Sequence, residues 1–238
     1  MSIVALIDHA VLQPTQTDVD LRSACKLCMD VGVASVCVKP SMVSLAAELL
    51  AGSPVVASTV IGFPHGGTTT GAKVRETEIA CREGAREVDM VVNLGRVLAK
   101  DWQFVGDDIR AVVEAARTGG AITKVIFETG LLPDDDVKIR LCELSEQAGA
   151  AFVKTSTGFG MVKDAGGHMA ATGATEHDIK LMRANCSDKV QVKASGGIRS
   201  FEDAQKFVKL GATRLGTSGT EAIAAGERGG QATSGASY

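Results

Sequence analysis

Eight short β-rich runs alternate with helix-like segments along most of the chain, and this alternation strongly limits the folds available to it. Gly-Ala pairs close several helix-like segments, at residues 84–85, 149–150 and 211–212, as a helix C-terminal glycine does before a chain returns to a sheet. Parallel strands need crossover connections of this kind, so the pattern predicts a single (β/α)8 TIM barrel. The expected strands are residues 4–9, 34–40, 55–63, 87–93, 123–129, 151–156, 190–195 and 213–218.

A doubly wound open sheet is the architectural alternative. That fold usually has fewer strands and a glycine-rich dinucleotide turn after the first, and no GxGxxG follows residues 4–9. The length of 238 residues suits a barrel, which typically has about 250. We predict a barrel domain over residues 1–225 and a flexible tail over residues 226–238, GERGGQATSGASY.

Composition and charge argue against several classes of protein. The formal net charge of −3 provides no basic field for nucleic acid. No apolar run approaches the roughly 20 residues that span a bilayer, and the start MSIVALIDHA does not resemble a signal peptide. Six scattered cysteines are too few for a disulfide scaffold, and Cys25 and Cys28 form a CxxC inside an expected helix (18–31), which favours ordinary thiols over a metal or redox site. We expect a cytoplasmic protein that binds neither nucleic acid nor membrane.

Charged residues fall on one face of four consecutive predicted strands. Asp89, Lys124, Lys154 and Lys193 each alternate with apolar residues, which in a barrel would face the helices while the polar face points inward. Burying isolated charges costs several kcal/mol each unless they are paired. Because the C-terminal face of a barrel carries its chemistry, this pattern predicts a catalytic group. A structural ion-pair network, such as Lys124 with Glu128 or Asp89, is the alternative. The same alternation places Glu87, Asn93, Glu128, Ser156 and Ser195 on the inner face.

Two neighbouring lysines indicate a nucleophilic amine. An ordinary lysine has a pKa near 10.4, so about one in 2,500 is neutral at pH 7. A second ammonium about 5 Å away opposes protonation by about 3 kcal/mol at an effective dielectric of about 20, which lowers the pKa by about two. Desolvation acts in the same direction. Lys154 and Lys193 occupy matching positions on adjacent predicted strands, so one of them could attack an aldehyde while Asp89 shuttles protons.

Glycine-rich loops follow the last two predicted strands, at residues 195–199 (SGGIR) and 216–219 (GTSG). Barrels often bind phosphate with these loops and a helix N-terminus. Tight βα turns are the alternative interpretation. The histidines at 9, 65, 168 and 177 lack HxH or HExxH spacing, so we expect no metal site.

The motifs IDHAVL, VIGFPHG, EVDMVVN, KVIFETGLL, FVKTSTGF, VKASGGIR and LGTSG resemble those of the deoxyribose-phosphate aldolases. The resemblance runs from about residue 6 to 220, with the motifs in the expected order. It implies a class I aldolase of deoxyribonucleotide catabolism that cleaves 2-deoxy-D-ribose 5-phosphate to acetaldehyde and D-glyceraldehyde 3-phosphate. It also implies that no metal or organic cofactor is required, and that the assembly is a monomer or a homodimer.

The resemblance assigns roles to individual residues. Lys154 of FVKTSTG would form the Schiff base, Lys193 of VKASGG would be the assisting cation, and Asp89 of EVD would relay protons. Asp8 of IDHAVL would support the substrate-hydroxyl side of the pocket. The terminal Tyr238, on a mobile tail long enough to reach the barrel mouth, would assist proton transfer, although a disordered terminus is the alternative. Phosphate contacts would fall on Gly158, Gly196, Gly197, Arg199, Gly216 and Ser218.

Two features depart from the family pattern. The first motif reads IDHAVL where IDHTLL is commoner, which removes a hydroxyl. The stretch 160–178 is longer than in many relatives, and we expect it to cover part of the mouth after residues 151–156. Two other functions remain open at this point, a non-catalytic sugar-phosphate-binding barrel and a Schiff-base aldolase for a different sugar phosphate.

Overall fold

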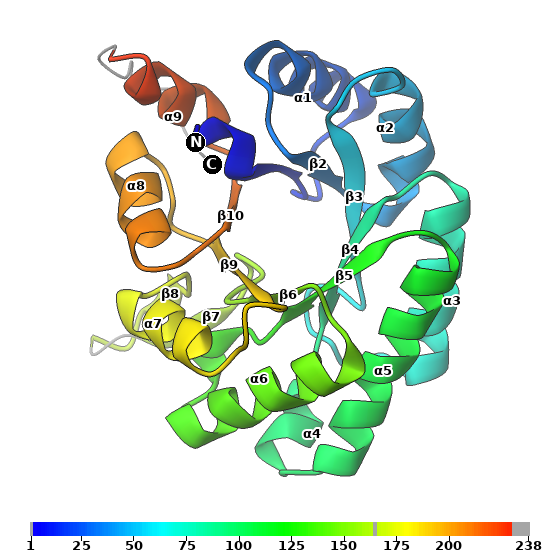
Figure 1. Ribbon diagram of the computed structural model, residues 1–238, viewed down its shortest axis with the longest axis vertical. Coiled ribbons are helices and arrows are strands. Elements are labelled where there is room, and N and C mark those ends of the chain that lie inside the picture. The colour runs from blue at the N-terminus through cyan, green and yellow to red at the C-terminus, as the bar shows by residue number, and fades with distance from the viewer. Residues whose placement is uncertain (1, 164–165, 230–238) are drawn as a thin grey trace.

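The computed structural model describes residues 2–163 and 166–229, and in that part of the chain eight parallel strands close into a barrel (Figure 1). Neighbours around the ring follow chain order, and β10 pairs with β1 to close it. The predicted (β/α)8 barrel is therefore confirmed. The barrel strands are β1 (Ile7–Val11), β2 (Ser35–Val38), β3 (Val56–Ile61), β4 (Glu87–Val91), β5 (Ile122–Ile126), β6 (Phe152–Lys154), β9 (Gln191–Ser195) and β10 (Arg214–Thr217).

Helices surround the ring of strands (Figure 1). The first of them coincides with the predicted helix over residues 18–31. A capping box between Thr17 and Asp20 begins it, and Gly32, in the left-handed conformation, ends it. The helices are α1 (Asp18–Val31), α2 (Val43–Leu49), α3 (Thr70–Arg82), α4 (Leu94–Leu98), α5 (Trp102–Thr118), α6 (Asp135–Ala148), α7 (Glu176–Ala184), α8 (Phe201–Lys209) and α9 (Thr220–Glu227), with 3-10 turns η1 (Val4–Leu6), η2 (Pro40–Met42) and η3 (Thr129–Leu131).

The main core lies between the outer face of the strands and the helices. Val88, Met90, Val125, Val153 and Val192 are fully buried there, which is the outward apolar face that strand alternation predicts. Inward-pointing residues of a barrel fill its interior as layers of side chains, so the opposite face forms a second, polar interior. Within the described residues, no helix combines the length and the apolar character needed to cross a membrane.

The first strand starts later than predicted. Residues 4–9 were expected to be extended, but Val4–Leu6 form the 3-10 turn η1, in which the Leu6 amide donates to the Ile3 carbonyl at 3.0 Å. The strand then begins at Ile7 and runs to Val11. This difference matters for the site because it places Asp8 at the start of β1, opposite Ser35 of β2.

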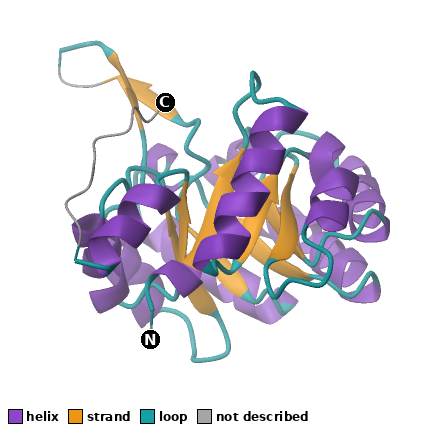
Figure 2. Cartoon of the chain, turned by 90° about the horizontal axis from the view of Figure 1, so that it is seen from above, coloured by secondary structure: helices purple, strands orange, loops and turns teal. Residues whose placement is uncertain are grey.

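The long connection after β6 contains an antiparallel hairpin, β7 (Met161–Lys163) and β8 (Met169–Ala171), which rises away from the body of the barrel (Figure 2). At its base the Thr172 amide donates to the Gly160 carbonyl at 2.8 Å. Met161 and Met169 are 45% and 56% exposed, so the hairpin packs little of its apolar surface onto the barrel.

The predicted boundary between barrel and tail, at residue 226, falls inside helix α9. Glu227, its last residue, accepts hydrogen bonds from Ser2 Oγ at 2.7 Å and from the Ile3 amide at 2.6 Å. The helix therefore belongs to the barrel to its end, and the prediction of a tail from residue 226 was wrong for these first residues. The rest of the predicted tail, 230–238 with Tyr238, lies outside the described residues.

Candidate active site

The interior is organised around Asp89 of β4. Its Oδ2 atom accepts from Lys154 Nζ of β6 at 2.9 Å and from Lys193 Nζ of β9 at 2.7 Å. The two lysines are direct partners in the register of these neighbouring strands. Because both nitrogens touch one oxygen, their separation cannot exceed the sum of these two distances. The three residues that the sequence predicts to act together are therefore in contact.

A third lysine completes the shell around Asp89. Lys124 Nζ donates to Asp89 Oδ1 at 2.7 Å and lies 2.7 Å from Glu87 and 3.3 Å from Asp8. The interior ion pair between Lys124 and Asp89, considered above as a structural alternative, thus exists beside the predicted catalytic group. Lys124 is fully buried, and burial opposes its charge, but Asp8, Asp89 and Glu87 outweigh this effect and raise its pKa well above the ordinary value.

Asp8 of β1 contacts residues of β2, β9 and β10, on both sides of the point where the barrel closes. It accepts from Lys193 Nζ at 2.5 Å, from Arg214 of β10 at 2.7 Å and from Ser35 Oγ at 2.7 Å. Arg214 also lies 2.8 Å from Glu87. Sequence reasoning missed Arg214 and Ser35. The available signal for Arg214 was its alternation with the buried Leu215 in the predicted strand over 213–218.

The charges of this cluster do not balance when every group is ionised. Among the described residues, three carboxylates face four basic groups, so one proton is in excess. An uncompensated buried charge is costly, and a lysine can release its proton. The carboxylates are Asp8, Glu87 and Asp89, and the bases are Lys124, Lys154, Lys193 and Arg214.

Lys154 is the lysine of this cluster whose pKa is lowered. Burial is the largest cause, the charge of Lys193 lowers the pKa further, and Asp89 raises it. Lys193 behaves in the opposite way, because Asp8 and Asp89 together outweigh its burial and raise its pKa. Burial thus lowers the pKa of Lys154 more than the neighbouring ammonium does, although the strand pattern predicts the ammonium as the main cause. Lys154 is therefore the amine that loses its proton most readily.

Asp89 stays ionised. Burial opposes its charge, but Lys124, Lys154 and Lys193 outweigh it and hold the pKa of Asp89 well below its usual range. A carboxylate held in this state accepts hydrogen bonds and takes up a proton only weakly. It can therefore orient two ammonium groups and a water more readily than it can act alone as a base.

The loops after β9 and β10 are bound to each other. Thr217 Oγ1 donates to the Ile198 carbonyl at 2.6 Å and accepts from the Gly219 amide at 2.8 Å. Gly196 and Gly197 have φ values of +86° and +80°, which residues with a side chain rarely adopt. The structure thus brings the two glycine-rich loops together at the C-terminal ends of their strands. Gly197 is open to its surroundings, whereas Gly196 is packed against Gly173, and its carbonyl accepts from the Ala174 amide at 3.2 Å.

The other predicted phosphate residues have different surroundings. Gly158, Arg199 and Ser218 are exposed just beyond the ends of β6, β9 and β10. Gly216 lies within β10, where a Cβ would come within 2.5 Å of Ser195 Oγ. Gly216 is therefore required for the packing of β10 against β9, and its contact with phosphate stays a prediction.

Asn93 and Glu128, both predicted to face the interior with the lysines, lie beyond the strand ends. Asn93 caps helix α4. Glu128 has a left-handed φ of 46°, which ends the alternation of β5. Its carboxylate accepts hydrogen bonds from the hydroxyls of Thr157 and Thr172, on the two segments that flank the hairpin. Regular alternation stops where the strand stops, so the inward assignment of these two residues stays a prediction.

The cysteines of the CxxC motif are ordinary buried thiols. Cys25 and Cys28 lie on α1, and burial raises their pKa to about 11 and about 12. Thiols in this state are poor nucleophiles and poor metal ligands. Over residues 2–163 and 166–229 there is also no cluster of three or more His, Cys, Asp or Glu side chains suited to a metal. That the reaction needs no metal stays a prediction.

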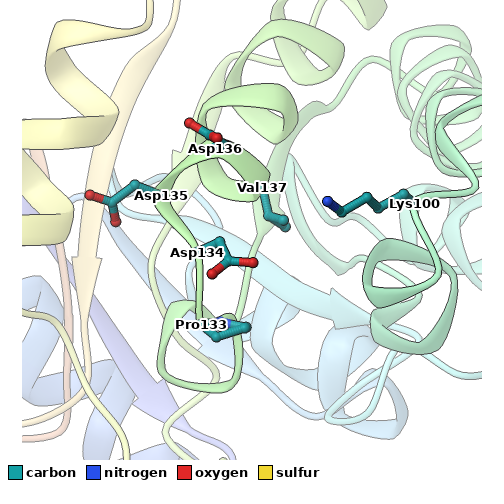
Figure 3. A pocket seen from close by; sticks show the side chains of 6 residues that line it. All are labelled: Lys100, Pro133, Asp134, Asp135, Asp136 and Val137. Atoms are coloured by element: carbon teal, nitrogen blue, oxygen red, sulfur yellow. The ribbon is translucent and has the colours of Figure 1, made fainter.

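A hollow of about 450 Å³ lies apart from this cluster, between Lys100 and the start of α6 (Figure 3). Lys100 reaches toward it from one side, and residues 133–137, with three consecutive aspartates, line the other. None of the residues predicted for catalysis or phosphate binding lines it. The interior around Asp89 is instead filled by its own side chains, as barrel interiors are.

The closed parallel barrel and its buried lysine–carboxylate cluster define the chain as a (β/α)8-barrel enzyme of the aldolase class. Comparison with known proteins narrows this class. The family model for DeoC/LacD family aldolases matches residues 2–228. The chain belongs to the DeoC/LacD family of aldolases.

Individual relatives match over nearly the whole chain. A deoxyribose-phosphate aldolase from Clostridium perfringens (strain 13 / Type A) is 48% identical over 225 residues, covering 94% of this chain and 95% of the relative. One from Bacillus cytotoxicus is 49% identical over 223 residues, covering 94% and 95%. A solved deoxyribose phosphate aldolase from Aeropyrum pernix, described as a unique tetramer, is 30% identical with a TM-score of 0.84, covering 95% of this chain and 91% of its own.

Proposed function

We propose that this chain is a class I aldolase that cleaves 2-deoxy-D-ribose 5-phosphate to D-glyceraldehyde 3-phosphate and acetaldehyde, with Lys154 as the Schiff-base residue. The observation that carries this proposal is the contrast between the two lysines on Asp89. Lys154 has a lowered pKa and Lys193 a raised one. A neutral amine beside a retained ammonium is what nucleophilic attack on an aldehyde requires.

In the first half of the cycle, the lone pair of Lys154 Nζ attacks C1 of the open-chain sugar. Loss of water from this adduct gives an iminium, which withdraws electrons from C2. A water held by Asp89 and Lys193 takes the proton of the C3 hydroxyl. The C2–C3 bond then breaks, its electron pair forms the enamine, and C3 becomes the aldehyde of glyceraldehyde 3-phosphate.

In the second half, the enamine accepts a proton at C2, with Tyr238 as the proposed donor. A water molecule then adds to C1 and replaces the one lost earlier, so acetaldehyde leaves and Lys154 regains its free amine.

Asp8 accepts hydrogen bonds from Lys193, Arg214 and Ser35, which supports a role in holding Lys193 charged. The role proposed for Asp8 is therefore to position Lys193, and not to bind the substrate directly.

The phosphate is assigned to the joined loops after β9 and β10. Backbone amides free of side chains can approach an anion closely, and helix α9 begins directly after the second loop. The proposed contacts are Gly158, Gly196, Gly197, Arg199, Gly216 and Ser218.

Borohydride trapping tests the proposal. Reduction in the presence of the sugar phosphate should attach a two-carbon or five-carbon adduct to Lys154, located by peptide mass spectrometry, and Lys154→Met should abolish both the adduct and cleavage. An adduct on another lysine, or full activity of the variant, contradicts the assignment. A coupled assay for glyceraldehyde 3-phosphate release separates an aldolase from a sugar-phosphate binder. Parallel assays with other sugar phosphates decide which one is the substrate.

The remaining proposals concern location and assembly. We place the enzyme in the cytoplasm, in the breakdown of deoxyribonucleotides, and the free state of the six cysteines supports a reducing compartment. A homodimer is the proposed assembly, and light scattering of the purified protein distinguishes it from a monomer or a tetramer.

A further inference from the structure

The hydroxyl of Ser156 is buried without a hydrogen-bond partner in the part of the chain that the structure describes. Such a group destabilises the folded state, because it gives up hydrogen bonds to water and gains none in return. Native proteins pair nearly all of their buried polar atoms, so an unpaired one calls for a physical explanation. A ligand that arrives after folding can supply the missing partner.

Ser156 follows Lys154 by two residues. β6 ends at Lys154, and Thr155 is held just beyond it from both sides: its amide donates to the Lys193 carbonyl at 3.2 Å, and its carbonyl accepts from the Thr129 amide at 2.8 Å. Two residues of extended backbone span about 7 Å. Ser156 therefore lies buried at the C-terminal end of β6, one such step beyond Lys154 and nearer to the mouth of the barrel.

The proposed substrate has an aldehyde carbon at one end, a phosphate at the other and hydroxyls on C3 and C4 between them. Lys154 takes C1, Asp89 and Lys193 serve the C3 hydroxyl, and Gly158 of the proposed phosphate site lies only two residues beyond Ser156. The C4 hydroxyl is left without an assigned partner. We propose that Ser156 is a substrate-binding residue that hydrogen-bonds the C4 hydroxyl, an inference that rests on the proposed function.

Access to Ser156 needs no movement beyond that required by the reaction itself. Lys154, Lys193 and Asp89 are 2%, 1% and 0% exposed, so the interior is nearly closed in this state. Covalent contact between a substrate and Lys154 requires the mouth to widen. Because Ser156 lies nearer to the mouth, the same movement uncovers its hydroxyl, which can rotate to meet the ligand.

The test uses the direction in which the carbon–carbon bond forms from acetaldehyde and an acceptor aldehyde. The 2-hydroxyl of glyceraldehyde 3-phosphate becomes the C4 hydroxyl of the product, and 3-oxopropyl phosphate is the same acceptor without it. We expect Ser156→Ala to lower kcat/KM at least tenfold with glyceraldehyde 3-phosphate and to change it less than twofold with 3-oxopropyl phosphate. Equal losses with both acceptors, or no loss with either, would overturn the inference.

Ser145→Ala is the matched control, because Ser145 of α6 is also a buried serine with an unpartnered hydroxyl among the described residues. It should leave kcat/KM unchanged with both acceptors. Ser156→Cys, which keeps the side-chain size but donates weakly, should show the same selective loss and replaces the alanine variant if that variant does not fold. Wild-type enzyme inactive with both acceptors would contradict the proposed function, whereas active wild type with a non-selective Ser156→Ala contradicts only the role of Ser156.

Discussion

Lys154 and Lys193 donate hydrogen bonds to the same atom, Oδ2 of Asp89, yet their pKa values are shifted in opposite directions. The difference comes from Asp8, which adds a second carboxylate next to Lys193 at 2.5 Å. Asp89 Oδ2 thus holds the two amines together, while Asp8, which contacts Lys193 and not Lys154, decides that Lys193 is the one that stays charged.

Replacing Lys193 should change how the reactivity of Lys154 depends on pH. The charge of Lys193 lowers the pKa of Lys154, so Lys193→Met should raise that pKa and move the rise in reactivity to higher pH. Cleavage at neutral pH should fall at least 100-fold, because the proton relay is also lost. The measurement is the rate of borohydride trapping as a function of pH. The surface variant Lys189→Met should match wild type, and a shift of the Lys193→Met profile to lower pH would contradict the argument.

Replacing Asp89 by asparagine should separate catalysis from stability. Asp89→Asn leaves Lys124 and Lys193 short of a carboxylate and should cost about 3–5 kcal/mol of unfolding free energy, as breaking a buried pair does. The matched control is Asp108→Asn, which breaks the buried pair with Lys73 outside the site, where the two groups lie 2.6 Å apart. Both variants should lose stability in urea titrations, but only Asp89→Asn should lose kcat, by 100-fold or more. Full kcat in Asp89→Asn would remove Asp89 from the mechanism.

His9 should make the barrel less stable in mild acid. Its Nδ1 atom forms a hydrogen bond of 2.8 Å with Oγ1 of Thr220, at the start of α9. Burial lowers the pKa of His9 from 6.5 to about 4. The unfolded chain therefore binds this proton first as pH falls, so stability is complete above about 6.5 and declines by about 3 kcal/mol toward pH 4. His9→Gln should flatten the unfolding free energy across this interval. An unchanged slope in the variant would show that other groups control it.

The hairpin should be separable from the barrel. Its two strands pair with each other, and Thr172 closes its base on Gly160 and Glu128. Replacing residues 161–170 by a short Gly-Ser link, with Thr172 retained, should leave the unfolding midpoint within a few degrees of wild type and keep cleavage of the sugar phosphate. A collapse of stability would mean that the hairpin supports the fold, and Thr172→Val in the full chain tests the anchor separately.

Tyr238 is predicted to assist protonation of the enamine. Tyr238→Phe should lower kcat about 100-fold or more, because general acid catalysis by one side chain contributes about 10²- to 10⁴-fold. It should leave thermal unfolding unchanged. Proton exchange at C2 of acetaldehyde, followed by NMR in deuterated water, should slow by a similar factor. An unaltered exchange rate would assign no chemical role to this residue.

The central part of the site could be predicted because it follows from strand alternation. Asp89, Lys124, Lys154 and Lys193 each stand next to an apolar residue of the opposite face, and this alternation is kept in the folded sheet. Alternation with Leu215 places Arg214 on the inner face as well, but its partner could not be predicted, because Asp8 is 206 positions away and meets it only when β10 closes on β1.

Local irregularities limited the rest of the prediction. Glu128 and Asn93 continue the alternation in sequence, but the backbone has already left the strand where they stand. The η1 turn occupies part of an expected strand because Ile3 and Leu6 bond locally before Ile7 reaches its partner in β10. Strand interiors are set by burial on both faces, whereas strand ends depend on single hydrogen bonds that composition does not reveal.

Ser2 and Ile3 donate hydrogen bonds to Glu227 of α9, so the first and last parts of the described chain lie side by side. A circularly permuted chain follows from this geometry, with residue 229 joined to residue 2 by a short linker and new termini opened within the hairpin. Such a rearranged polypeptide would keep every strand pair of the ring and all seven ionisable groups inside it, although β6 and β9 would then lie at opposite ends of the gene.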